Sequence, residues 1–426
     1  DWREGMRFFF KDAGKVLTVL IAGGMAGLIL LMIVYAIPVD RMLVNARASI
    51  EIFEREGPSP QTIIGYEATT LDNYTDAWMF RNAFYDGRES VFQKSLNVYY
   101  YGYHKEELHN VCESMIAYLN GTEGYERQSY ARYWHGYLIF LKPLLCFFDY
   151  GDIRGILRLT EMSLLMYLCL LFERRRFARF LPALAVTMFC IGFYDIGQSM
   201  QYSWIFLITV AASIYLLKKY PVMDGKMLFL AVGMCTSYFD FLTYPVFTLG
   251  IPLIVLLLCR FSSGEKKGAV KTVLYHSIFW GIGYFGFCLE KWILCNLLTE
   301  ENVIEEAFLS ITERVGRQVV DQPIGYMETV FENFKVLCKY PYALAILGVT
   351  ALILWGFRKK RLKTDWEHAA ACLIVAVYPF IWYAVALNHS YVHAFMTYRD
   401  LGISIFAGLC MLESMKEIDC NERKET

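Results

Sequence analysis

Long apolar stretches, separated by shorter polar ones, run along the chain from Val16 onward. A bilayer core about 30 Å thick is crossed by a helix of about 20 mostly apolar residues. The first stretch meets this length by itself, and several later ones fall somewhat short of it. The pattern predicts about ten membrane-spanning helices, at Val16–Ile37, Ile153–Phe172, Phe177–Tyr194, Trp204–Leu217, Lys226–Phe239, Pro245–Cys259, Val270–Leu289, Tyr342–Phe357, Ala369–Leu387 and Leu401–Met415.

Lysine and arginine recur in every second loop between these stretches. The basic segments lie at about residues 3–15, 174–179, 218–226, 260–271, 358–363 and 416–424. Because cytoplasmic loops carry an excess of Lys and Arg, this alternation places both termini in the cytoplasm. The sequence therefore predicts one all-α, polytopic membrane domain over residues 1–426, a multi-pass protein of the cell (plasma) membrane.

Two long segments then fall on the outer side, at about residues 38–152 and 299–341. Apolar residues recur at helical spacing within 41–56, 106–120 and 304–315. Such stripes are typical of amphipathic helices that lie at a membrane interface. The equal alternative is that these helices pack on one another above the bundle.

A further apolar run, Arg132–Phe148, carries Lys142-Pro143 near its middle. A complete crossing here would move the basic segment Arg174–Arg176 to the outer side, against the alternation. We therefore expect a helix that dips into the outer leaflet, with its Trp and Tyr side chains in the interfacial aromatic belt.

The composition agrees with a membrane protein. Hydrophobic residues make up 56% and charged residues 19% of the chain, against about 45–50% and about 25% in soluble proteins. The formal net charge of −1 lacks the basic excess of a nucleic-acid-binding protein. The near-zero sum combines basic cytoplasmic segments with an acidic remainder, so the acidic excess lies on the predicted outer side.

Candidate chemistry gathers at the predicted outer ends of the spans. Ionisable groups within a membrane are costly and therefore mark functional sites. The candidates are Asp72 and Asp76 in LDNYTDAWM, Arg132 and His135 in RYWH, Asp195 and Gln198 in YDIGQSMQ, Asp240 and Tyr244 in SYFDFLTYP, and Asn388, His389, His393 and Arg399 in LNHSYVHAFMTYRD.

Asp72 and Asp76 are four residues apart, so on a helix they would share one face. Two such carboxylates can hold a divalent cation, or can separate into a base and a charge stabiliser. The alternative is a helix start, with Asp72 as its cap and Asp76 in its first turn. Asp195 and Asp240 have a similar alternative, because each could cap a short helix at the interface.

His389 and His393 are also four residues apart, but no third metal ligand follows at a suitable spacing. Hydrogen bonding or phosphate contact therefore suits these histidines better than metal binding. Arg132, His135 and Arg399 are the natural partners for a phosphate or pyrophosphate.

The layout resembles the GT-C class of integral-membrane glycosyltransferases: one span, a large outer segment with an early acidic motif, then further spans. The segments that carry the resemblance are LDNYTDAWM, ARYWHGYLIFLKPLL and NHSYVHAFMTYR. The resemblance implies a sugar donor linked to a polyprenyl phosphate at the outer face, and an outer acidic residue as base or ligand of a divalent cation, Mg²⁺ or Mn²⁺. That role maps to Asp72 or Asp76, with Asp40 as a rival close behind the first span. The phosphate-binding role maps to Arg132, His135 and Arg399, with His389 beside them.

Three functions follow as hypotheses. The first is transfer of a sugar to an envelope glycan, lipid or protein at the outer face, with Asp195, Gln198, Asp240, Tyr244, Asn388 and His393 as substrate-binding residues. The second is a transporter or flippase for a lipid-linked sugar or a small anion, which should place charged residues near mid-membrane in several spans. The third is a non-catalytic assembly factor, which would not need Asp72, Asp76 and Arg399 together.

Overall fold

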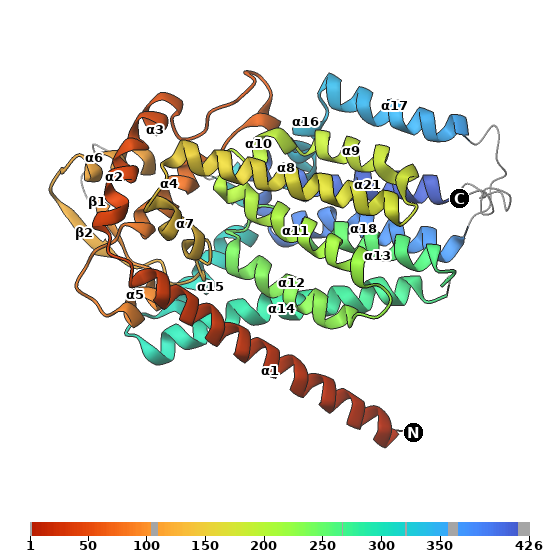
Figure 1. Ribbon diagram of the computed structural model, residues 1–426, viewed down its shortest axis with the longest axis horizontal. Helices are drawn as coiled ribbons and strands as arrows, with labels where there is room; N and C mark the ends of the chain where they lie inside the picture. Colours follow the sequence, from red (N-terminus) through yellow and green to blue (C-terminus); the bar gives the residue numbers. More distant parts are fainter. Residues whose placement is uncertain (1, 104–109, 266, 320–321, 357–364, 416–426) are drawn as a thin grey trace.

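The structure is a computed structural model that describes residues 2–103, 110–265, 267–319, 322–356 and 365–415. It is a mostly helical bundle, with residues 36–149 gathered at one end (Figure 1). We call residues 36–149 the head segment and this end of the bundle the head end. Helix α1 (Trp2–Tyr35) starts, and α21 (Leu401–Ser414) finishes, at the opposite end.

The bundle contains helices that are long and apolar enough to cross a membrane. Within the described residues there are six: Ala13–Tyr35 of α1, α8 (Tyr150–Arg174), α11 (Met200–Lys219), α14 (Ala269–Leu298), α18 (Trp366–Val385) and the run Ala394–Ser414 that ends in α21. A bent pair, α16 (Tyr326–Leu337) and α17 (Tyr340–Gly356), would make a seventh and turns by 84° at its break. The chain therefore has the character of a multi-pass membrane protein.

Three shorter apolar helices complete the predicted set. They are the stretch Ala178–Cys190, which joins η2 (Ala178–Phe180) to α9 (Leu181–Cys190), α12 (Gly225–Phe239) and α13 (Phe247–Ser262). Each of the ten predicted stretches thus coincides largely with helix, although only six reach spanning length by themselves. The number of ten spans stays a prediction.

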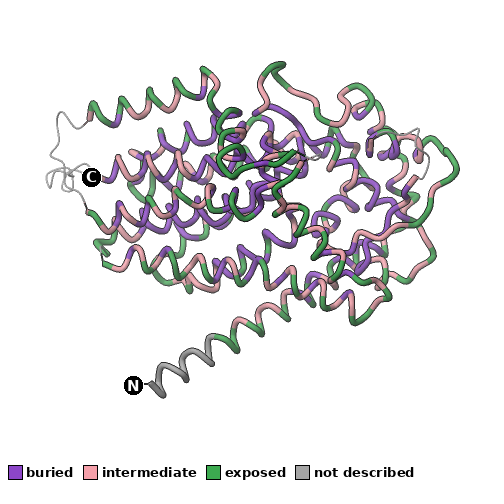
Figure 2. Tube along the Cα trace, turned by 180° about the vertical axis from the view of Figure 1, so that it is seen from behind, coloured by how far each residue is buried: buried purple, intermediate pink, exposed green. Residues whose placement is uncertain are grey.

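Close helix packing holds α12 against α14. Gly233 and Gly283 allow this approach, because a Cβ on Gly233 would lie 2.1 Å from the carbonyl oxygen of Trp280, and one on Gly283 would lie 2.1 Å from that of Leu230. Small residues at a crossing let two backbones approach closely in membrane bundles. The interior of the bundle is buried, whereas much of α1 is exposed along its length (Figure 2).

The head segment is a small folded layer of its own. It contains α2 (Asp40–Ala48), α3 (Ile50–Glu56), η1 (Glu67–Thr69), α4 (Asn73–Ala83), α5 (Val91–Asn97), β1 (Tyr100–Tyr103), α6 (Val111–Leu119), β2 (Tyr125–Gln128) and α7 (Leu138–Leu145). Strands β1 and β2 pair antiparallel, with Tyr100 opposite Gln128 and Tyr103 opposite Tyr125.

The apolar stripes of the head segment face protein. Phe53 of α3 is buried and stacks on Tyr150 with ring centroids 4.6 Å apart, and Met115 of α6 is also buried. These helices therefore pack on their neighbours, as the alternative predicted. The predicted single helix over 41–56 is divided at Ser49, and residues 106–109 of the second stripe lie outside the described residues.

Helix α15 (Val303–Val315) behaves differently. Its stripe residues Phe308, Ile311 and Val315 are exposed, and only Val303 and Ala307 are buried. An amphipathic helix with an uncovered apolar face is suited to a membrane interface. The second segment also holds β3 (Gln318–Val319) and β4 (Gln322–Pro323), which form a two-residue ladder.

The predicted dipping helix is shorter than its apolar run. Helix α7 covers only Leu138–Leu145, about 12 Å at 1.5 Å per residue. Residues 132–137 before it are not helical, and His135 among them has a positive φ of 57°. Lys142 is buried and its Nζ donates to the carbonyl oxygen of Ala83, 2.5 Å away. The lysine therefore joins α7 to the end of α4.

Candidate functional site

Asp72 begins helix α4 as its cap. One carboxylate oxygen, Oδ1, accepts a hydrogen bond from the backbone N–H of Thr75 at 3.1 Å, and the Asp72 N–H donates to Ser199 Oγ at 2.9 Å. The other oxygen, Oδ2, is buried without a hydrogen-bond partner. Buried polar atoms are nearly always paired, so this free oxygen marks Asp72 as a candidate for contact with a ligand.

Asp76 is fully engaged inside the fold. Its Oδ2 accepts from the N–H of Met200 at 2.9 Å and from the hydroxyl of Tyr150 at 2.5 Å, and its Oδ1 accepts from the N–H of Gln201 at 3.0 Å. Burial raises the pKa of Asp76 to about 7, and the backbone amides at the start of α11 that donate to its carboxylate favour the anion. Asp76 is thus held as a structural cap of α11, whereas Asp72 keeps one oxygen free.

A buried ion-pair network fixes α4 against α3 and α8. Arg154 Nη1 lies 3.0 Å and 2.8 Å from the two carboxylate oxygens of Glu56, and its Nη2 donates to Asn73 Oδ1 at 2.7 Å. The guanidinium also lies over the ring of Tyr150, 4.1 Å from its centroid. Burial would raise the pKa of Glu56. The charge of Arg154 and the hydrogen bonds that the Glu56 carboxylate accepts outweigh this effect and hold that pKa below its usual value. This network orients the helix that Asp72 caps.

Arg399, in η3 (Tyr398–Asp400), is fully buried at the head end. Its Nη2 donates to the carbonyl oxygen of Ala68 at 3.4 Å, and the same oxygen accepts from the hydroxyl of Tyr398 at 3.1 Å. The guanidinium lies 4.0 Å from the ring centroid of Tyr202 and 6.0 Å from that of Tyr244. Its Nε has no partner, and no carboxylate of the described residues is within ion-pair distance of it.

Asp195 lies in the same region, in α10 (Phe193–Ile196). Its Oδ1 accepts from the hydroxyl of Thr62 at 2.6 Å and from Nε2 of Gln198 at 3.3 Å. Gly192 just before it has a φ of +67°, and a Cβ there would lie 3.1 Å from the Ala68 carbonyl oxygen and 3.2 Å from the Tyr398 hydroxyl. Glycine is therefore needed where the chain turns against the 68–70 segment.

The positive charge of Arg399 opposes the rise in pKa of both Asp72 and Asp195. Burial raises the pKa of Asp72, and the Thr75 hydrogen bond and the charge of Arg399 oppose that rise. Burial also raises the pKa of Asp195, opposed by Thr62 and again by Arg399. Asp72, Asp195 and Arg399 therefore share one electrostatic environment, and with Gln198 and Tyr244 they form what we call the Asp72 cluster.

A second group surrounds the turn that follows α12. Asp240 closes this turn on itself, because its carboxylate accepts from the N–H of Thr243 at 3.1 and 3.2 Å. The ring of His135 lies 4.9 Å from that of Phe241, and His389 Nε2 donates to the carbonyl oxygen of Leu242 at 2.6 Å. The turn leads directly to Tyr244, so this group adjoins the Asp72 cluster.

The histidines of this group are engaged in the fold. His135 Nε2 donates to the carbonyl oxygen of Tyr130 at 2.7 Å, and its Nδ1 lies 3.0 Å from the hydroxyl of Tyr137. Burial lowers the pKa of His135 well below its usual value, so its imidazole is neutral at pH 7. The rings of His389 and His393 lie 4.6 Å apart. His135 is thus buried and hydrogen-bonded within the fold, and its phosphate-binding role stays a prediction.

The remaining candidates lie outside the Asp72 cluster. Arg132 is paired with Glu306 of α15 and lies over the ring of Tyr130. Asn388 donates to the carbonyl oxygen of Gln318 at 2.6 Å. Asp40 is exposed in the first turn of α2.

Three residues near these groups were not singled out from the sequence. Tyr202 and Tyr398 contact Arg399, and Arg314 of α15 lies 5.9 Å from the ring centroid of Tyr133 with its Nε unpartnered. Tyr398 lies inside the motif NHSYVHAFMTYR, directly before Arg399, so its position beside a candidate residue could have identified it from the sequence. Nothing in the local sequence distinguishes Tyr202 or Arg314 from other aromatic or surface residues.

The donor atoms do not favour a metal on the Asp72–Asp76 pair. Both oxygens of Asp76 already accept hydrogen bonds, which leaves one free oxygen between the two carboxylates. Across the described ranges, no three His, Cys, Asp or Glu side chains are grouped so that they could hold an ion.

Comparison with known proteins gives no relative. No family model, no curated protein and no solved structure matches the chain.

Proposed function

We propose that this protein is a GT-C-like membrane glycosyltransferase, which transfers a sugar from a polyprenyl-phosphate donor to a cell-envelope acceptor at the outer face. The observation that carries the proposal is the buried, unpartnered Oδ2 of Asp72 in the field of the buried guanidinium of Arg399, whose Nε has no partner and which has no carboxylate partner among the described residues. The proposal places the head end outside, both termini in the cytoplasm and ten crossings in the plasma membrane.

Asp72 would act as the general base. Its Oδ2 accepts the proton of the acceptor hydroxyl while that oxygen bonds to the anomeric carbon of the donor sugar. The bond between the anomeric carbon and the phosphate oxygen breaks, and its electron pair stays on the departing polyprenyl phosphate. A raised pKa makes the Asp72 carboxylate a better base than an exposed aspartate.

Arg399 would stabilise the leaving phosphate. A guanidinium with an unpartnered Nε and no carboxylate partner can give charge-assisted hydrogen bonds to a phosphate oxygen. Tyr202 and Tyr244 hold the guanidinium from the bundle side. Asp195 and Gln198 would bind sugar hydroxyls. Arg132, His389, Asn388 and His393 are proposed to contact the donor or acceptor from the adjoining group.

A divalent cation is not part of this mechanism. Asp76 cannot offer a free oxygen without giving up its bonds to the start of α11. The residues present therefore do not fit an Asp72–Asp76 cation site, and no step is assigned to a metal.

The distribution of charge supports an enzyme over a transporter. In α11 the charged residues are Lys218 and Lys219 at the last turn, and in α14 they are Lys271 near the start and Glu290-Lys291 in the last third. Glu161 of α8 comes nearest to the middle of a candidate span. A transport pathway would place polar groups near mid-membrane, whereas, Glu161 apart, these charges lie toward the ends of their helices.

The test is sugar transfer by the purified protein from a labelled polyprenyl-phosphate sugar, together with envelope-glycan analysis of cells. Asp72→Asn should lower transfer by about 10²–10⁴-fold, because Asn keeps the Thr75 cap but cannot take the proton. Asp40→Asn is the matched control, since it makes the same change at an exposed helix start. Unchanged envelope glycans and transfer in a folded Asp72→Asn protein would refute the proposal. Uptake of the labelled donor by proteoliposomes would support transport instead.

A further inference from the structure

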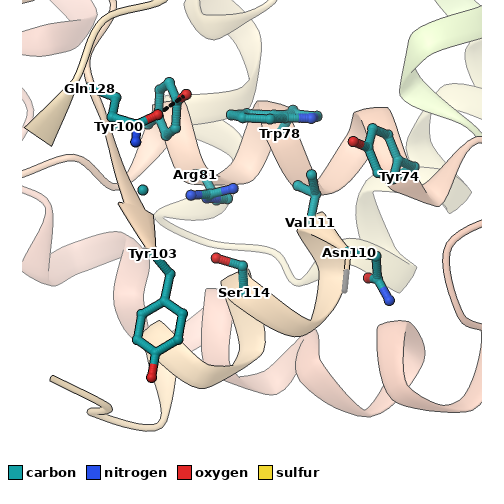
Figure 3. A pocket seen from close by; sticks show the side chains of 10 residues that line it. Tyr74, Trp78, Arg81, Tyr100, Tyr103, Asn110, Val111, Ser114 and Gln128 are labelled. Atoms are coloured by element: carbon teal, nitrogen blue, oxygen red, sulfur yellow. Dashed lines mark hydrogen bonds between the residues drawn. The ribbon is translucent and has the colours of Figure 1, made fainter. Parts of the chain in front are cut away.

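A second face of helix α4 lines a cavity. Tyr74, Trp78 and Arg81 follow one another at i, i+4 and i+7 and therefore lie on one side of the helix. They line a cavity of about 240 Å³ together with residues of β1, α6 and β2 (Figure 3). Among the described residues the lining also includes Tyr100, Gly102, Ser114 and Gln128. Neither Asp72 nor Asp76 is part of it.

The charged side chain that lines this cavity is the buried Arg81. Arg81 is only 5% exposed, and its Nη2 donates to the carbonyl oxygen of Tyr101. Its guanidinium lies 4.7 Å from the ring centroid of Trp78 and 4.9 Å from that of Tyr100. No Asp or Glu of the described residues lines the cavity, and none of the ion pairs found among them includes Arg81. A buried arginine is ordinarily paired with a carboxylate.

A second, independent observation points to a ligand. Ser114 is 7% exposed, lines the cavity, and its Oγ has no hydrogen-bond partner. It lies beneath the guanidinium of Arg81 in the close view (Figure 3). Gln128 accepts from the hydroxyl of Tyr100 through Oε1 at 2.5 Å, so its Nε2 remains a donor. A Cβ on Gly102 would come within 2.4 Å of the Gln128 side chain, so glycine leaves room for that amide.

We propose that this cavity binds a sugar unit that carries a carboxylate, such as a uronic-acid residue of an envelope glycan. Aromatic rings suit the apolar faces of a sugar, and a guanidinium matches a carboxylate in a two-point contact. The hydroxyl of Ser114 and the amide of Gln128 supply polar partners for ring hydroxyls. The volume is below the range of about 300–1,000 Å³ typical of drug-sized ligands, which fits a small ligand such as a single sugar unit.

The binding site does not depend on the proposed transfer reaction. Its lining residues take no part in the Asp72 cluster, although α4 belongs to both. Asp72→Asn should therefore leave binding in the cavity unchanged while it removes transfer. If glucuronate binds but no transfer occurs, the glycosyltransferase proposal fails and the binding proposal stands.

The experiment is calorimetry or saturation-transfer NMR on the full-length protein in detergent, with glucuronate, glucose and acetate as separate probes. Glucuronate should bind at least tenfold more tightly than glucose or acetate. Arg81→Gln and, separately, Ser114→Ala should weaken glucuronate binding by tenfold or more. Arg88→Gln is the matched control, because Arg88 is exposed on the same segment.

Several outcomes would overturn the proposal. Equal binding of glucose and glucuronate would remove the role of the carboxylate, and equal binding of acetate would leave a simple anion site without sugar recognition. Undetectable binding of all three probes would also refute it. Because Arg81 is buried, the folding of Arg81→Gln is checked by thermal unfolding. If this variant does not fold, the comparison of the three probes on the wild-type protein and the effect of Ser114→Ala decide whether the proposal holds.

Discussion

The strongest stability prediction concerns Arg154. Replacing it by Met removes the bonds of Nη1 to Glu56 and the bond of Nη2 to Asn73 while keeping an unbranched apolar side chain over Tyr150. The half-buried carboxylate of Glu56 then loses its buried cation and keeps only the contacts from Asn73 and Arg55, and Asn73 Oδ1 keeps only the longer contact from the Tyr150 hydroxyl at 3.4 Å. Breaking a buried ion pair by removing one partner costs about 3–5 kcal/mol.

The structure places this change at the lower end of that range. The Glu56 side chain is 21% exposed, so water can solvate part of the freed carboxylate. We therefore expect a loss of about 3 kcal/mol in the free energy of unfolding. Arg154 lowers the pKa of Glu56. The stability that this ion pair contributes is therefore fully present above the unfolded-state pKa of Glu56, and it is lost as the pH falls through the lower folded-state pKa.

The assay is denaturant or thermal unfolding of the purified protein in one detergent at pH 8. Arg158→Met on the same helix is the control, because its guanidinium lies 4.6 Å from the ring centroid of Tyr194 and forms no ion pair among the described residues. Its loss should cost about 0.5–1 kcal/mol. A double-mutant cycle with Glu56→Gln should show coupling between the two positions. Equal stabilities of Arg154→Met and Arg158→Met would refute the reasoning.

Four further predictions follow from the same geometry. Transfer should fall as pH decreases through a pKa above the ordinary aspartate value of about 3.9, because Asp72 must be ionised and burial raises its pKa; a pH–rate profile that is flat from pH 4 to 8 would contradict this. Gly192→Ala should destabilise the protein by about 1 kcal/mol in thermal unfolding, since φ is +67° and the new Cβ would crowd the Ala68 carbonyl. A tryptophan at Phe308 should be quenched by brominated lipids if α15 lies at the interface, whereas one at Ala307 should not. In a cysteine-free background, Cys at exposed Ile64 should react with an impermeant thiol reagent from outside and Cys at Lys219 should not; the reverse pattern would invert the proposed orientation.

The sequence predicted the positions of the helices better than their lengths. Helix α14 continues to Leu298, beyond the expected end at Leu289, although Glu290-Lys291 interrupts the apolar run. Lys291 is buried and donates to the carbonyl oxygen of Leu96 at 2.5 Å. A charge that ends a span in sequence can thus be satisfied by a distant backbone group that no local pattern shows.

The same limit applies to the paired carboxylates. The local pattern did predict a helix start with Asp72 as cap and Asp76 in the first turn, and this alternative is confirmed. Spacing could not tell which carboxylate stays free, because Asp76 is satisfied by amides at residues 200 and 201. It also could not separate Arg399, which joins the Asp72 cluster, from Arg132, which pairs with Glu306.

The hydrogen bonds to the carbonyl oxygen of Ala68 affect when the site can form during biosynthesis. This oxygen is held by Tyr398 and Arg399, residues 330 and 331 positions later in the chain. During synthesis the segment around Ala68 emerges early, but its partners in η3 arrive only some 330 residues later. The Asp72 cluster therefore cannot close until residues 398–399 have been synthesised and have reached the head end, and a nascent chain that stops before them would hold an incomplete site.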